Sequence, residues 1–318
     1  MIWLTYRQHR WEALLTLAVI VILGLPNLIA GLQAPSVIAA LGIPACVANP
    51  NFGTECSAAF NQFGRQFGWT SYFSILFVAL PALVAPFLGA PLVSREHEFR
   101  TSLLVWAQGI TRTRWLVTKI VLFAAVLAGG AWLLAAIAPI AAQAWSYRPA
   151  RWQDAFEWSP AVIVGTALFA LALGVFAGAL TRRALAAMLI ALVAIAVARG
   201  AVISQLRPTA FIPPIVATSH VGIPPDAWVI SSDYVDANGN PVGIDRLIQL
   251  NNEFFRTGSR AVLVSSDDYY AQNGVFVRVK YQPREREGQL QGIEFTLYAG
   301  LAVALFAASV WLVRRRPA

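Results

Sequence analysis

Six long apolar segments constrain what this sequence can fold into. A helix needs about 20 residues to cross a hydrocarbon layer about 30 Å thick, and each of the six segments reaches that length. The segments are continuously apolar and do not alternate in polarity, so they predict membrane-spanning helices and not the strands of a barrel. The predicted spans are residues 11–33, 70–93, 115–142, 160–180, 185–205 and 293–313.

The overall composition agrees with this interpretation. Apolar residues make up 58% of the 318 residues, and charged residues only 13%. An average soluble domain has about 25% charged residues. The composition therefore excludes a soluble globule, a disordered chain and a disulfide-dense secreted domain. We expect an α-helical polytopic membrane protein with six transmembrane helices and a small α+β extracytoplasmic domain between helices 5 and 6.

The positions of the basic residues predict the orientation. The net charge is +8. With the N-terminus inside, the short outer loops hold Arg65, Arg148 and Arg151, whereas the inner side holds twelve basic residues, as the positive-inside rule requires. Both termini are then cytoplasmic, and the surplus charge gives no support to nucleic-acid binding. The twelve are Arg7, Arg10, Arg95, Arg100, Arg112, Arg114, Lys119, Arg182, Arg183, Arg314, Arg315 and Arg316.

Two regions lie outside the membrane in this topology. Cys46 and Cys56, the two cysteines of the chain, both fall in the first outer loop, where they either form a disulfide or stay as two thiols. Residues 206–291 are long enough for a small folded domain. Its predicted elements are a strand at 227–235, a turn at 236–241, a helix at 244–255 and a strand at 274–283.

Two short segments are expected on the inner side. Residues 1–10 are aromatic and basic, which suits either an interfacial helix or a plain membrane-anchor end. Residues 94–114 form the loop between spans two and three. Ser94 is a candidate N-cap there, and the apolar residues of the loop recur at helical spacing. This amphipathic helix either docks a cytoplasmic partner or merely connects two spans. Its apolar face comprises Phe99, Leu103, Trp106 and Ile110.

Several residues within the spans also carry expectations. Pro81, Pro86 and Pro91 predict kinks in span two. Gly174 and Gly178 form a G-x-x-x-G pair, which permits close contact between helices. A buried charge at Arg199 would be a functional candidate, but its place near the outer end of span five favours snorkelling to the surface.

The sequence lacks the motifs of an enzyme. No P-loop can be matched, because neither of the two lysines follows a glycine. The three histidines have no metal-ligand spacing, so no metal and no bound cofactor are expected. Glu12 and Glu294 lie only at span ends, which disfavours a proton-coupled transporter.

The segment PLVSREHEFRTSLLVWAQGITRTRWLVTK, residues 91–119, resembles the second cytoplasmic loop of ABC transporter permeases of the type-2, exporter class. The opening WLTYRQHRW and the layout of six spans with an outer domain are also similar to this class, particularly to actinobacterial permeases. The resemblance covers essentially the full chain. It implies a membrane subunit in the plasma (inner) membrane of a bacterium.

The resemblance also implies partners and roles. A separate cytoplasmic ABC ATPase would bind ATP and Mg, and two permease copies, identical or paralogous, would form the translocation path among membrane lipids. Residues 1–10 would be the entry helix, residues 11–205 would carry spans one to five, and residues 292–318 would carry span six and a basic tail. Coupling to the ATPase would fall to Arg95, Glu96, Glu98, Phe99, Thr101, Leu103, Trp106, Arg112 and Arg114.

A different class of function is also compatible with the residues. A non-transporting sensor or receptor would bind a ligand through its outer domain and engage a signalling protein through residues 94–114. Under the exporter hypothesis, the residues are compatible with export of a drug, a peptide, a lipid or an antibiotic.

Overall fold

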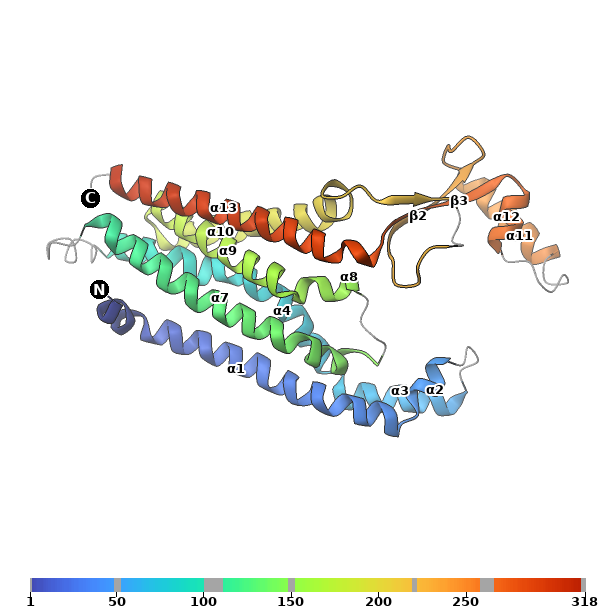
Figure 1. The fold of residues 1–318 in the computed structure, drawn as a ribbon, viewed down its shortest axis with the longest axis horizontal. Coiled ribbons are helices and arrows are strands. Elements are labelled where there is room, and N and C mark those ends of the chain that lie inside the picture. The colour runs from blue at the N-terminus through green and yellow to red at the C-terminus, as the bar shows by residue number, and fades with distance from the viewer. Residues whose placement is uncertain are drawn as a thin grey trace. The chain divides into compact units, whose positions relative to one another are not determined.

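The computed structural model describes residues 2–48, 53–99, 111–147, 152–218, 222–257 and 266–315. The chain divides into two compact units. Unit 1 comprises Met1–Val202 and Gln291–Ala318, and unit 2 comprises Ile203–Leu290. Figure 1 draws the whole chain, with α-helices and β-strands labelled in chain order.

Unit 1 is helical. Between the named helices lie two short irregular turns, the π-helical turn η1 (Ala85–Gly89) and the 3₁₀ turn η2 (Phe156–Trp158). Figure 1 shows that the beginnings of α1 and α7 and the end of α13 lie at the same end of this unit. The helices are α1 (Ile2–Ala40), α2 (Ile43–Ala48), α3 (Thr54–Phe67), α4 (Thr70–Val84), α5 (Ala90–Glu98), α7 (Arg112–Trp145), α8 (Trp152–Ala155), α9 (Pro160–Thr181), α10 (Ala184–Ala201) and α13 (Glu287–Arg315).

Five helical segments in the described part of the chain are long and apolar enough to cross a membrane. The predicted span at 70–93 is instead divided among α4, η1 and α5, which have 15, 5 and 9 residues. A total of six spans therefore stays a prediction. The five segments are Ile20–Ala40, Arg112–Trp145, Pro160–Thr181, Ala184–Ala210 and Arg284–Arg315.

Helix α9 is the central helix of unit 1. Within its apolar window 72% of the residues are buried, against 28% to 33% in the other four segments. The reason is its content of alanine and glycine, which lets neighbouring helices approach from several sides. In each of the other four segments, most residues of the apolar window are not buried within the protein, as is expected of helices that face lipid.

The G-x-x-x-G pair of α9 packs directly on the backbone of η1 and α5. A Cβ atom on Gly174 would lie 2.7 Å from the Cα of Gly89, and a Cβ on Gly178 would lie 2.6 Å from the carbonyl oxygen of Ala90. Both positions therefore need glycine. The expected close contact is confirmed, and its partner is the irregular turn around Pro86 that interrupts the second predicted span.

Helices α1 and α7 run side by side (Figure 1). Gly31 of α1 abuts the backbone of α7 at Ile140. Four residues earlier, the amide oxygen of Asn27 accepts a hydrogen bond of 3.0 Å from the indole N–H of Trp145. The buried amide of Asn27 also donates to the carbonyl oxygen of Leu23, so both ends of this side chain are paired.

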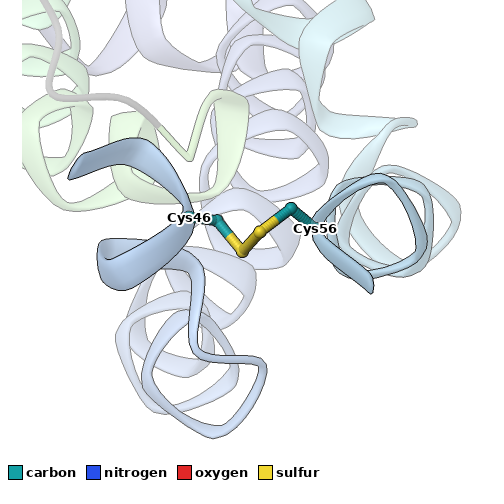
Figure 2. Close-up of a disulfide and its surroundings, with 2 residues drawn as sticks. All are labelled: Cys46 and Cys56. Carbon is teal, nitrogen blue, oxygen red and sulfur yellow. A yellow bond between two sulfur atoms is a disulfide. The ribbon is translucent and has the colours of Figure 1, made fainter. Parts of the chain in front are cut away.

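The segment after α1 folds into α2 and α3, which are joined by a disulfide between Cys46 and Cys56 (Figure 2). The two Cα atoms are 5.5 Å apart. Helix α3 is amphipathic, and it buries Phe63 and Phe67 against the ends of α1 and α7. The disulfide thus closes a small apolar cluster at one end of the helical unit.

In the residues that the structure describes, unit 2 contains a three-stranded antiparallel sheet and two α-helices. The strand order is β1-β3-β2, with β3 in the centre. The predicted strands and helix are confirmed to within two residues at each end. The elements are β1 (Ile215–Ala217), β2 (Trp228–Asp236), α11 (Ile244–Thr257), α12 (Ser266–Gln272) and β3 (Val275–Gln282).

The predicted turn after β2 is confirmed as well. The carboxylate of Asp236 accepts hydrogen bonds from the backbone N–H groups of Asn238 and Asn240, at 2.8 and 2.9 Å. Hydrogen bonds from Asn240 hold the pKa of this carboxyl below its usual value. Gly239 takes the left-handed backbone conformation that such a turn needs, with φ of 82°.

The contact between α9 and η1 gives a first prediction. Gly174→Ala forces an added methyl group against the backbone of Gly89, so we expect it to destabilise the protein by about 1–3 kcal/mol, as overpacking does. Thermal unfolding of the purified protein in detergent measures the loss. Gly129→Ala in α7 is the matched control, because a methyl group there meets nothing within 4 Å. Equal melting temperatures for the two variants would contradict the packing described here.

Candidate functional site

The predicted partner-docking loop begins differently from expectation. Ser94 does not cap a new helix: it lies inside α5, fully buried, and its hydroxyl donates to the carbonyl oxygen of Ala90 at 2.7 Å. The prediction of an N-cap at Ser94 is wrong because α5 continues past Pro91, and an internal serine can bond to its own helix. Helix α5 ends at Glu98, with Phe99 as its C-cap.

The first glutamate of the motif points into the protein. Glu96 forms an ion pair with Lys119 of α7, and the Lys119 side chain is only 2% exposed. The ammonium group also lies 4.9 Å from the centroid of the Trp115 ring. A lysine this deeply buried needs a carboxylate partner, so the pair fixes the end of α5 against the beginning of α7.

The second glutamate holds a different helix. A carboxylate oxygen of Glu98 accepts a hydrogen bond of 3.1 Å from the backbone N–H of Ala184, the first residue of α10. Arg183, the N-cap residue of α10, makes no capping bond with its own side chain. Glu98 therefore acts as the cap from outside, and its negative charge suits the N-terminal end of the helix dipole.

His97 lies between the two glutamates and is half-buried. Its ring meets that of Trp115 edge-on, with the centroids 6.3 Å apart. Burial lowers the pKa of His97 below its usual value, and the positive charge of Arg182 lowers it further, although Glu96 acts in the opposite direction. The folded protein thus favours the neutral imidazole more than the unfolded chain does.

Other predicted coupling residues remain accessible at this end of unit 1. The Phe99 side chain is 70% exposed, and Arg95 and Arg114 are exposed as well. Arg112, the first residue of α7, is half-buried. An exposed aromatic residue with two exposed guanidinium groups is suited to contact another protein. Thr101, Leu103 and Trp106 lie outside the described residues.

Helix α7 begins at a side-chain cap. Thr111 is the N-cap of α7, and its hydroxyl accepts a hydrogen bond of 3.3 Å from the backbone N–H of Arg114. Together with the Glu96–Lys119 pair, this cap fixes both ends of the segment between Phe99 and Thr111. We call Arg95–Phe99 and Thr111–Lys119 together the loop base.

A second polar cluster lies elsewhere in unit 1, and the sequence prediction for it was wrong. Arg199 does not snorkel to the surface, since it is only 8% exposed. Its guanidinium donates to Glu294 of α13 at 3.0 Å and to the hydroxyl of Tyr298 at 3.3 Å, and it pairs with Glu157 of η2. Glu294, expected only at the end of a span, is fully buried.

The signal for this cluster was present in the predicted topology. Residues 157, 199 and 294 all lie near the outer ends of predicted spans, and therefore in the outer half of the membrane or at its outer surface. Opposite charges at one depth in adjacent helices can form ion pairs. Because pairing offsets the cost of burying a charge, a paired side chain does not need to snorkel to the surface. Among the described residues, no group of three or more His, Cys, Asp or Glu side chains is arranged to hold a metal ion.

The family comparison covers most of unit 1. A family model described as ABC-2 membrane transporter related matches residues 16–207, more than half of the 318 residues. The chain belongs to the ABC-2 membrane transporter related family. Neither the curated proteins nor the solved structures include a match to it. With five apolar helical segments among its described residues, this family member is a multi-pass membrane protein and an ABC-2 type permease.

The matched segment contains most of the helices described above. It includes α1 from residue 16 onward and all of α2 to α10, and hence the whole loop base of the permease. Most of unit 2 and all of α13 fall beyond its end. The features that the permease shares with its family therefore lie in the helices around α9.

The buried ion pair of the permease gives a second prediction. Lys119→Met leaves Glu96 largely buried without its cation, so we expect a loss of about 3–5 kcal/mol in the free energy of unfolding. The double variant Lys119→Met with Glu96→Gln removes both charges and recovers most of the loss. Thermal unfolding of the three proteins in one detergent provides the measurement. A double variant no more stable than the single one would contradict a paired role.

His97 gives a prediction about pH. Its pKa is lower in the folded permease than in the unfolded chain, so the unfolded chain binds more protons as the pH falls through about 6.5. Stability is therefore lost on acidification below about pH 6.5. Between pH 7.5 and 5.5, the melting temperature of wild type should fall further than that of His97→Gln. Parallel curves for the two proteins would show that His97 does not contribute.

Proposed function

We propose that this permease is the membrane subunit of an ATP-driven exporter. In this proposal a separate cytoplasmic ABC ATPase binds ATP and Mg, and two permease copies, identical or paralogous, form the translocation path. Membership in the ABC-2 family supports an ATPase partner. The sequence contains no P-loop, which agrees with ATP hydrolysis by a separate subunit.

The orientation of the proposal follows from the charge distribution. The loop base and the end of α13 both carry basic residues, and they lie at the same end of unit 1 (Figure 1). By the positive-inside rule this end faces the cytoplasm of a bacterium, across the plasma membrane. The disulfide between Cys46 and Cys56 supports an oxidising compartment on the other side.

The observation that carries the coupling proposal is the rigid loop base. Glu96 and Glu98 are used to hold α7 and α10, so they position the loop. The exposed side chains of Arg95, Phe99 and Arg114 are the ones available to contact the ATPase. Motion of a bound ATPase at residues 99–111 would then be passed to two helices at once. In this scheme the first turns of α1, up to residue 10, serve as the entry helix along the inner leaflet.

The coupling proposal predicts the effect of charge on the loop. Phe99→Asp with Leu103→Asp replaces two apolar contacts by carboxylates, so the ATPase should co-purify at least about tenfold less, as loss of interface anchors causes. The candidate ATPase is co-expressed with the permease, pulled down through a permease tag and quantified. Stimulation of ATP hydrolysis in liposomes should fall in parallel.

A matched pair of substitutions provides the control. Ile244→Asp with Ile248→Asp changes two exposed apolar residues of α11 in unit 2, which are 72% and 53% exposed. This variant should keep wild-type binding of the ATPase. If the loop variant also binds the ATPase normally and keeps full stimulation, the coupling role is refuted. A sensor or receptor would show no ATPase association in either protein.

A further inference from the structure

A groove lies between two membrane-spanning helices of unit 1, at the end where α7 begins and α13 ends. Its cavity volume is about 750 Å³, within the range of about 300–1,000 Å³ typical of small-molecule sites. Val117 and Ile120 of α7 form one wall. Phe306 and Val310 of α13 form part of the other.

One end of the groove is basic. Arg314 and Arg315 line it together with Trp311, and the guanidinium carbon of Arg315 lies 4.7 Å from the centroid of the Trp311 ring. The described residues that line the groove include no acidic side chain. The two guanidinium groups therefore present positive charge next to an apolar cleft. Guanidinium groups bind phosphate oxygens with paired hydrogen bonds, and stacking on an aromatic ring holds them in place.

The exposed apolar side chains of the groove indicate that it faces lipid. Val303 at its edge is 69% exposed and Trp311 is 51% exposed, in a helix long and apolar enough to span the membrane. Such side chains face lipid acyl chains in a membrane protein. Tryptophan and arginine near a helix end mark the level of the lipid headgroups. The apolar part of the groove is thus at the depth of acyl chains, and the basic part is at the depth of phosphates.

We propose that this groove between α7 and α13 binds an anionic phospholipid. The phosphate lies at Arg314 and Arg315, and an acyl chain runs along Phe306 and Val117. Charge complementarity selects the ligand, because two guanidinium groups without an acidic neighbour favour a headgroup of net negative charge over a zwitterionic one. The basic end of this site is on α13, outside the loop base, and Val117 is the loop-base residue that lines it. Its test needs no ATPase.

The test uses the full-length permease and two lipids with identical acyl chains, phosphatidylglycerol and phosphatidylcholine. Native mass spectrometry in detergent measures the affinity of each lipid. Wild type should bind phosphatidylglycerol about tenfold more tightly than phosphatidylcholine. Arg314→Gln with Arg315→Gln should remove this preference, whereas Arg314→Lys with Arg315→Lys should retain most of it. Equal affinities of wild type for the two lipids would overturn the proposal.

A second pair of variants tests the location without changing any charge. Ala307→Trp fills the groove that Ala307 lines, so binding of phosphatidylglycerol should fall at least about fivefold. Ala304→Trp is the control, because Ala304 is exposed on the same helix but does not line the groove. Unchanged lipid binding in Ala307→Trp would refute the site. So would a loss of permease dimers in Ala307→Trp with lipid binding intact, since the groove would then be a protein contact.

Discussion

The close backbone contact between α9 and the turn η1 is the constraint on which the rest of unit 1 depends. Gly174 and Gly178 have no side chains, so the backbone of Gly89 lies directly against α9. Backbone atoms in such contact have no freedom to adjust as side chains do, and the register between the two helices is therefore fixed. Helix α5 continues from η1, so the position of its end, with the two glutamates of the loop base, follows from this contact.

The loop base shows how one short motif connects three helices. Glu96 and Glu98 are two residues apart on α5, and they reach in different directions, to Lys119 of α7 and to the N–H of Ala184. The charged motif that the sequence suggests as a docking surface thus also connects helices within the protein. The exposed residue Phe99 follows directly where α5 ends, so its position depends on the contacts of Glu96 and Glu98 and not on its own.

Sequence reasoning succeeded where one local rule was sufficient. In unit 2, strand β3 follows the alternation of apolar and polar residues, and the turn after β2 follows its turn-forming residues. It failed where tertiary contacts decided the outcome. Ser94 has the right residue type for a cap, yet α5 simply continues through it. The prediction for Arg199 considered that residue alone, whereas the burial of its side chain depends on Glu157 and Glu294, which are far away in the sequence. The break at η1 was foreseen only as a proline kink.

The two ends of α10 have a consequence when they are considered together. At one end its first N–H is held by Glu98 of α5, and near the other end Arg199 is held by Glu157 and Glu294. These anchor points are separated by about 22 Å of helix, at 1.5 Å per residue. Carboxylates from other elements thus bind helix α10 near both of its ends. A displacement of this helix along its axis must strain the Glu98 hydrogen bond and the Arg199 ion pairs at once, so the two ends of α10 cannot move independently.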